Sequence, residues 1–310
     1  MKESIDKTTR DLIRLGDLDG ADRIVKAEFE RNDDLGPSAE VWGLRLCRAD
    51  LLRLSGRVEE ALEYLLLKES AFPPEGDDLS SIIGLKKTRG YCLGQLGKYA
   101  PSHGLMEEAE FLARKAGMLE MLCDVQSCQG MIFYLQKDHE PSSRIYRFIL
   151  DASDQMDGWY FKNNARWGIG KNLMAQGFYN EAIQWFEESL TIAESAGSRA
   201  LMALAWGELA VCHLKLGDDG KSLSLLKNAL QIHFETGRVQ NYLVSLANIG
   251  NIYLYRCDYL RAIDYYRRAL ELAYEIKDPV SIRKWSHNIR LSYARLRESV
   301  ERMRTTTDSM

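Results

Sequence analysis

The chain of 310 residues has little proline, no excess of basic charge and no long apolar run. Six prolines in the whole chain favour a helical protein, because proline interrupts helices. A formal net charge of −4 gives no sign of the basic face that nucleic-acid-binding proteins present to phosphates. Residues 1–10 lack the apolar core of a signal peptide, and the longest apolar run, Ala200 to Cys212, contains Glu208 and is too short to span a bilayer. We therefore expect a cytoplasmic protein that binds neither nucleic acid nor membrane.

Sequence patterns that carry chemistry are missing as well. The six cysteines are scattered, and five of them lie within predicted helices, where a small apolar side chain is suitable. Cys123 and Cys128 are five residues apart, and no second Cys or His pair with metal-ligand spacing accompanies them. The chain has no GxGxxG motif, no phosphate-binding loop and no HExxH motif. We predict no cofactor, no metal site and no catalytic residue.

What the chain does contain is an internal repeat. In each unit a small residue precedes a turn, a second small residue follows it, and a large side chain stands four positions later, as in Gly170, Ala182 and Phe186. These spacings predict two helices joined by a short turn, and such a hairpin buries its apolar face only by stacking on the next one. The predicted turn residues recur at intervals of 40 or 41 positions: Gly16, Gly56, Gly97, Lys137, Gly177, Gly217 and Cys257.

The strings IGKNLMAQGFYNEAIQWFEESL and IGNIYLYRCDYLRAIDYYRRAL resemble tetratricopeptide repeats, whose unit has a small residue after Leu, a Gly-x-Tyr turn and then Ala, aromatic, Ala. The resemblance covers almost the whole chain and is weakest in the first four units. There Arg48, Arg89 and Gln129 replace the usual Leu, and Lys137 and His139 replace the Gly and Tyr of the turn. A period of 40 also suits HEAT or armadillo arrays, but the pattern inside the unit favours the tetratricopeptide type with a longer second helix. Kinesin light chains and bacterial signalling regulators have similar units.

This resemblance implies an all-α fold, a right-handed α-solenoid of seven helix-turn-helix repeats followed by a C-terminal capping helix. We predict a single array over residues 1–310, with a capping helix at 281–304 and a frayed tail at 305–310. The predicted repeats span residues 2–41, 42–82, 83–122, 123–162, 163–202, 203–242 and 243–280.

The resemblance also implies that the first helix of each repeat lines a concave groove. Positions 2, 5, 9 and 12 of the unit share one helix face there. In the first three units this face is a wall of mixed charge that includes Arg14, Arg53 and Lys87. The later units present amides, aromatics and single charges, which we predict to bind a ligand: Tyr134, Asn164, Trp167, Lys171, Glu208, Lys215, Asn248, Asn251, Tyr255, Lys284, His287 and Asn288.

Asparagine is a poor helix former, so its recurrence on this face suggests a role. Side-chain amides can pair with both N–H and C=O groups of an extended peptide, and aromatic rings supply apolar anchors. The alternative is that Trp167 and Tyr255 pack between repeats and that the asparagines are merely solvated. The carboxylate clamp of chaperone-binding repeats is matched only by Asn248 and Lys284, which does not support a chaperone co-factor.

From the sequence we predict a non-enzymatic adaptor that holds a peptide or helical segment of a partner protein in its concave groove. The alternative is a regulatory or sensor subunit that controls a separate enzyme, such as a protease or phosphatase, in bacterial signalling or defence. An enzyme in its own right would need a convergent polar pocket with a perturbed titratable group, and the sequence shows none. We expect a monomer and leave a dimer open.

Overall fold

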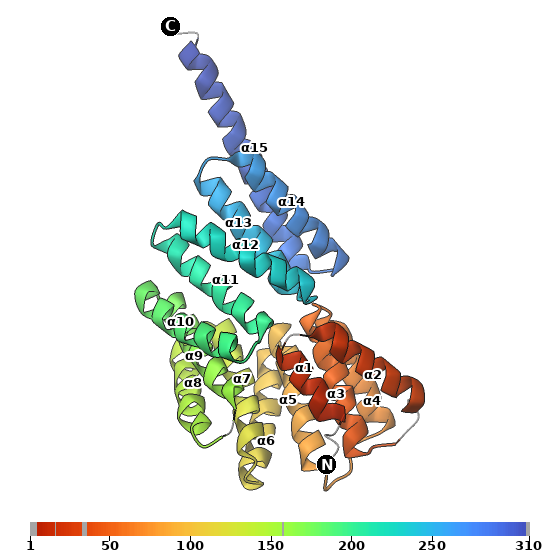
Figure 1. The fold of residues 1–310 in the computed structure, drawn as a ribbon. Helices are drawn as coiled ribbons and strands as arrows, with labels where there is room; N and C mark the ends of the chain where they lie inside the picture. The colour runs from red at the N-terminus through yellow and green to blue at the C-terminus, as the bar shows by residue number, and fades with distance from the viewer. Residues whose placement is uncertain (1–4, 16, 33–35, 157, 308–310) are drawn as a thin grey trace.

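The computed structural model describes residues 5–15, 17–32, 36–156 and 158–307, and within these ranges every regular element is an α-helix (Figure 1). Successive helices form seven antiparallel hairpins, α1/α2 to α13/α14, which we number one to seven, and α15 follows them. None of the helices described is both long and apolar enough to cross a membrane. The bounds are α1 (Ile5–Leu15), α2 (Leu18–Asn32), α3 (Ala39–Leu54), α4 (Val58–Ala71), α5 (Leu79–Gln95), α6 (Tyr99–Lys115), α7 (Leu119–Leu135), α8 (His139–Ser153), α9 (Trp159–Ala175), α10 (Tyr179–Ser195), α11 (Arg199–Lys215), α12 (Asp219–Glu235), α13 (Val239–Tyr255), α14 (Tyr259–Glu275) and α15 (Pro279–Thr307).

The turn inside each of hairpins two to seven contains a residue in the left-handed region. Gly56, Gly97, Gly177 and Gly217 have φ between 75° and 89°. A residue with positive φ just after a helix satisfies the last carbonyl groups and redirects the chain. Lys137 and Cys257 take the same conformation, at φ 66° and 58°, although neither is glycine. The predicted turn positions are therefore confirmed in hairpins two to seven, whereas Gly16 lies outside the described residues.

Small residues and aromatic rings face each other between the helices. A Cβ added at Gly170 would come within 2.7 Å of the ring of Phe186, and one added at Gly250 within 2.8 Å of Tyr266. Real Cβ atoms essentially never come so close, so only glycine fits at these positions. The predicted pairing of a small first-helix residue with a large second-helix residue is therefore the packing unit of hairpins five and seven.

Serine takes the second small position in three hairpins and adds a hydrogen bond. The hydroxyls of Ser102, Ser142 and Ser222 each donate to a backbone carbonyl twelve residues earlier, at 2.7 to 2.8 Å. All three side chains are buried. Each bond fixes the two helices of one hairpin to each other at the level of the small residue.

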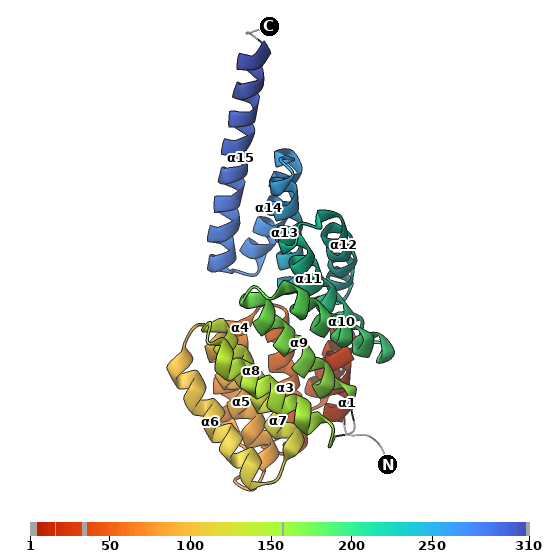
Figure 2. The ribbon, with the colours of Figure 1, turned by 90° about the vertical axis from the view of Figure 1, so that its left-hand side faces the viewer.

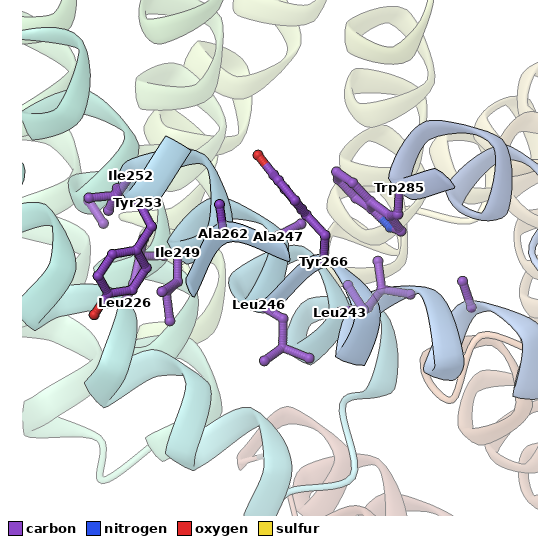
Figure 3. Close-up of a cluster of buried hydrophobic side chains, with 13 residues drawn as sticks. Leu226, Leu243, Leu246, Ala247, Ile249, Ile252, Tyr253, Ala262, Tyr266 and Trp285 are labelled. Carbon is purple, nitrogen blue, oxygen red and sulfur yellow. The ribbon is translucent and has the colours of Figure 1, made fainter. Parts of the chain in front are cut away.

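The C-terminal end is closed by α15. Tyr266 of α14 stacks on Trp285 of α15, with ring centroids 6.3 Å apart and planes 12° from parallel, inside a cluster of thirteen buried residues (Figure 3). Trp285 and Ile289 pack on hairpin seven, whereas Tyr293 is exposed. Beyond this contact α15 continues away from the array as a single helix (Figures 1 and 2).

The N-terminal hairpin meets the sixth one, so the concave side is closed into a ring. The hydroxyl of Ser198 donates to the carbonyl of Arg14 at 3.2 Å, and Nη2 of Arg238 donates to the carbonyl of Ile13 at 3.5 Å. The Arg14 guanidinium lies 4.5 Å from the ring centre of Tyr160 in α9. We call these contacts the seam. Figure 1 shows α1 beside the end of α11, far from it in sequence.

Candidate functional site

The inner surface of the ring encloses two connected hollows. The inner cavity, of about 280 Å³, is formed mainly by residues of α1, α3, α5, α7, α9 and α11. The larger outer groove, of about 1180 Å³, runs between α3 to α5 on one side and α9 to α13 on the other, as far as the start of α15. First helices of the hairpins supply most of the lining, as the repeat geometry predicts. Six residues line both hollows: Arg53, Leu54, Tyr91, Trp167, Leu204 and Arg238.

Charged pairs form the wall of the inner cavity. Arg53 bonds Asp50 at 3.0 Å and lies 4.8 Å from the ring centre of Tyr91. Lys87 lies 3.4 Å from the carboxylate of Asp124. Burial by itself would lower the pKa of Lys87, but Asp124 raises it above its usual value. Burial raises the pKa of the Tyr91 hydroxyl, so at neutral pH this wall contains fixed cations and a neutral phenol.

Four residues meet around Lys171, and three of them, Trp167, Lys171 and Glu208, line the outer groove. The Lys171 ammonium lies 2.9 Å from the carboxylate of Glu208, and both side chains are 16% exposed. The same ammonium lies 5.0 Å from the ring centre of Tyr134 and 5.6 Å from that of Trp167, within cation–π range. We call these four residues the Lys171 cluster. It offers a ligand an aromatic face and charges of both signs.

Residues 162–233 and 201–275 match the family model of the tetratricopeptide repeat. This part of the chain consists of tetratricopeptide repeats. The matched residues run from α9 to α14, which are the hairpins where the repeat pattern is clearest. Hairpins one to four carry the same architecture with a weaker pattern.

Known proteins give a match in sequence and several in structure. Protein FLUORESCENT IN BLUE LIGHT, chloroplastic, of Arabidopsis thaliana is 24% identical over 120 residues, which are 39% of this chain and 37% of that protein. The match therefore spans little more than a third of that relative's length.

Among solved structures, a Rap protein complexed with Competence and Sporulation Factor gives a TM-score of 0.69 at 18% identity, covering 95% of this chain and 85% of that one. NprR in complex with its cognate peptide NprX gives 0.65 at 15% identity, covering 94% and 86%. Aspartyl phosphate phosphatase F from Bacillus subtilis gives 0.58 at 12% identity, covering 99% and 85%. At these identities the likeness shows a shared fold.

Five of the twelve predicted ligand residues line the two hollows, namely Asn164, Trp167, Lys171, Glu208 and Asn248. Tyr134 lines neither hollow but lies over Lys171 in the Lys171 cluster. Asn164 lines the inner cavity and its amide donates to the hydroxyl of Ser127 at 3.0 Å, while Asn248 lines the outer groove. The predicted stripe therefore contributes lining residues from α9, α11 and α13.

The other six predicted residues line neither of these hollows. The amide oxygen of Asn251 accepts a 2.6 Å hydrogen bond from the hydroxyl of Tyr266, so this asparagine serves the packing of hairpin seven. Tyr255 is 68% exposed, and the ammonium of Lys284 lies 4.5 Å from the ring centre of Trp285. The remaining three are Lys215, His287 and Asn288.

Tyr160 and Arg238 are among the lining residues that the stripe analysis misses. Tyr160 stands at the start of α9, one turn before the stripe begins, and Arg238 stands in the turn that leads into α13. Neither residue occupies position 2, 5, 9 or 12 of a repeat, so the stripe analysis does not include them. Asp124 occupies stripe position 2 of unit four, so the same analysis extended to acidic residues finds it.

Proposed function

We propose that this tetratricopeptide protein is a non-enzymatic adaptor that binds an extended peptide segment of a partner in the outer groove. The carrying observation is the Lys171 cluster, because its Trp167 ring and its Lys171–Glu208 ion pair line a large groove. Small-molecule pockets typically hold about 300–1,000 Å³. A groove of about 1180 Å³ exceeds that range and favours a chain of several residues.

The chemistry of the groove fits a peptide. The Trp167 ring can cover an apolar side chain, and the Asn248 amide can bond the backbone of an extended segment. The relatives solved with Competence and Sporulation Factor and with NprX share this fold, which supports the proposal by analogy. The proposal treats residues 1–310 as one continuous array, monomeric and cytoplasmic, without catalytic residue or cofactor.

A random hexapeptide library tests the proposal. The full chain is mixed with the library, passed through a gel-filtration column, and the retained peptides are identified by mass spectrometry. We expect retention by the wild type and a loss of about tenfold in Trp167→Ala, since an aromatic anchor contributes much of the binding energy. Tyr255→Ala is the matched control, because this exposed aromatic residue lies outside both hollows. Equal retention by both variants would show that the groove is not the binding surface.

A second candidate is a regulatory subunit whose ring opens or tightens when a peptide binds and so controls a separate enzyme. The seam favours it, because hydrogen bonds and cation–π contacts connect hairpin one to α9, to the start of α11 and to the turn before α13. Small-angle scattering with a retained peptide distinguishes the two. A change in the radius of gyration supports regulation, whereas an unchanged radius supports the passive adaptor.

A further inference from the structure

The inner cavity has more positive than negative charge on its wall. Its lining contains five cations and two carboxylates: Arg10, Arg14, Arg53, Lys87 and Arg238 with Asp50 and Asp124.

The two carboxylates already have partners. Asp50 pairs with Arg53 at 3.0 Å, and Asp124 lies 3.4 Å from Lys87. Arg14 lies 4.0 Å from the same Asp124. Both carboxylates of the cavity lining are thus already paired with cations of the same lining.

Arg10 pairs with Asp6 at 2.7 Å, which leaves Arg238 as the remaining cation of this lining. Its side chain is 7% exposed, and within the described ranges no carboxylate lies within 4.0 Å of it. Its Nη2 donates to the carbonyl of Ile13 at 3.5 Å, a long bond, and its Nε has no hydrogen-bond partner. Burial lowers the pKa of this guanidinium to about 10, which reflects a charge that its surroundings do not compensate.

A purely structural role explains only part of this arrangement. Cations are favourable at the C-terminal end of a helix, and Ile13 lies in the last turn of α1. One weak hydrogen bond to a carbonyl does not offset the desolvation of a buried guanidinium, which costs several kcal/mol. Buried charges in proteins are normally paired, so the vacant donor points to an anion supplied from outside the chain.

The position of Arg238 suggests what brings that anion. It is one of the six residues that line both hollows, so it borders the outer groove as well as the inner cavity. Leu201 and Leu204 of α11 also line the inner cavity and add apolar surface to it. A carboxylate matches the planar fork of a guanidinium. Asp50 and Asp124 would repel a doubly charged phosphate more strongly than a single carboxylate.

We propose that Arg238 binds a carboxylate of the peptide held in the outer groove, either its C-terminus or an Asp or Glu side chain. The inference rests on the proposed function and specifies the class of peptide. A carboxylate in this place would contact the turn before α13 and approach the end of α1, so the ligand would join both sides of the seam.

Four matched hexapeptide libraries test the inference by the same gel-filtration and mass-spectrometry assay. They combine a free or amidated C-terminus with the presence or absence of Asp and Glu. We expect the wild type to retain at least one carboxylate-bearing library about tenfold better than the library that has no carboxylate, as charge-assisted bonds to a buried site allow. The library that carries the preference identifies the source of the carboxylate.

Variants of the full chain assign the preference to one side chain. Arg238→Gln should keep retaining peptides but lose the preference for carboxylates, and Arg238→Lys should keep part of it, because a lysine retains the charge without the fork. Arg256→Gln is the control, since Arg256 lies outside both hollows and pairs with Asp219. Circular dichroism melting checks that each variant folds.

The outcomes separate the two proposals. If the wild type retains all four libraries equally, the carboxylate site is wrong while the peptide groove stands, and this result needs no variant. A carboxylate preference that persists in Arg238→Gln also overturns the assignment to Arg238. If none of the libraries is retained, the proposed function itself fails.

Discussion

Hairpin two and hairpins five and seven reach the same helix-turn-helix architecture with different side chains. In hairpins five and seven, glycine faces an aromatic ring across the two helices. In hairpin two, the Arg45 guanidinium is 1% exposed and lies 5.0 Å from the ring centre of Trp42 and 4.9 Å from that of Phe72. Arg48 lies over Tyr64 in a similar way, at 5.3 Å. The N-terminal end therefore depends on cation–aromatic stacking where the C-terminal end depends on close backbone approach.

This difference accounts for the uneven family pattern. A repeat pattern records small and large apolar residues at fixed positions, so a hairpin packed by arginine over aromatic rings matches it poorly. The family model accordingly matches only residues within 162–275. The fold tolerates both solutions because each one fills the space between the helices.

The largest expected effect tests the glycine packing at the start of the C-terminal hairpins. A Cβ added at Gly168 would come closer than 3.0 Å to the ring of Tyr146, whereas one added at Gly207 would have no atom within 4 Å. We expect Gly168→Ala to lower the free energy of unfolding by about 3 kcal/mol through overpacking. Gly207→Ala should raise it by about 1 kcal/mol through helix propensity. Urea denaturation measures both, and equal effects would contradict the packing account.

The next effect tests the N-terminal hairpins. Arg45→Met keeps much of the side-chain volume but removes the charge between two rings, and we expect a loss of about 2 kcal/mol in the free energy of unfolding. Arg48→Met should cost about 0.5 kcal/mol, because Arg48 is exposed. Thermal melting of the two variants provides the comparison. A smaller loss for Arg45 than for Arg48 would show that stacking does not hold this end together.

Mild acid should act on the C-terminal hairpins. His233 of α12 is 3% exposed, and burial together with nearby Arg238 lowers its pKa from 6.5 to about 3. The unfolded chain takes up a proton near pH 6.5 while the folded chain does not, so stability is complete above pH 6.5 and falls as the pH drops towards 3. Hairpins one and two contain no histidine.

Between pH 7 and pH 5.5 we expect a loss of about 1 kcal/mol in the free energy of unfolding. His233→Leu should remove most of this loss, and His287→Gln, at an exposed position, should leave it unchanged. Urea titrations at the two pH values measure the difference. A pH dependence that survives in His233→Leu would place its origin elsewhere.

The smallest effect concerns turns. Lys137 has φ 66° where Gly177 has φ 89° in the next hairpin. Because a side chain is strained in the left-handed region, we expect Lys137→Gly to raise the free energy of unfolding by roughly 0.5 to 1 kcal/mol. Gly177→Ala should lower it by a similar amount, and the midpoint of urea denaturation reports both. A loss of stability in Lys137→Gly would mean that the lysine side chain makes a contact worth more than the strain.

The hairpins and their turns could be predicted from the sequence because they depend on local spacing. Gly56, Gly97 and Gly217 recur where a left-handed residue ends a helix, and periodicity places the small and large residues around them. The predicted stripe also contains all four members of the Lys171 cluster, because their positions in the repeat place them on one helix face. Helix register thus carries over from sequence to structure.

Closure of the ring could not be predicted in the same way. It depends on small rotations that add up over several hairpins, and only this sum brings Arg238 to Ile13. The position of a residue in the helical repeat fixes the helix face on which it lies, but not which residues it contacts. Asn248 and Asn251 belong to the same helix face, yet one lines the groove and the other bonds Tyr266.

The seam has a consequence for how many repeats this molecule can have. In a stacked array each hairpin contacts its neighbours, so units can usually be added or removed without affecting distant ones. Here the hydroxyl of Ser198 donates to the carbonyl of Arg14, 184 positions away in the sequence. The two groups meet because the rotations between successive hairpins add up over the hairpins that lie between them. Removing or inserting one unit would carry the two partners past each other. The seam contacts can therefore form only with the present number of hairpins between α1 and α11.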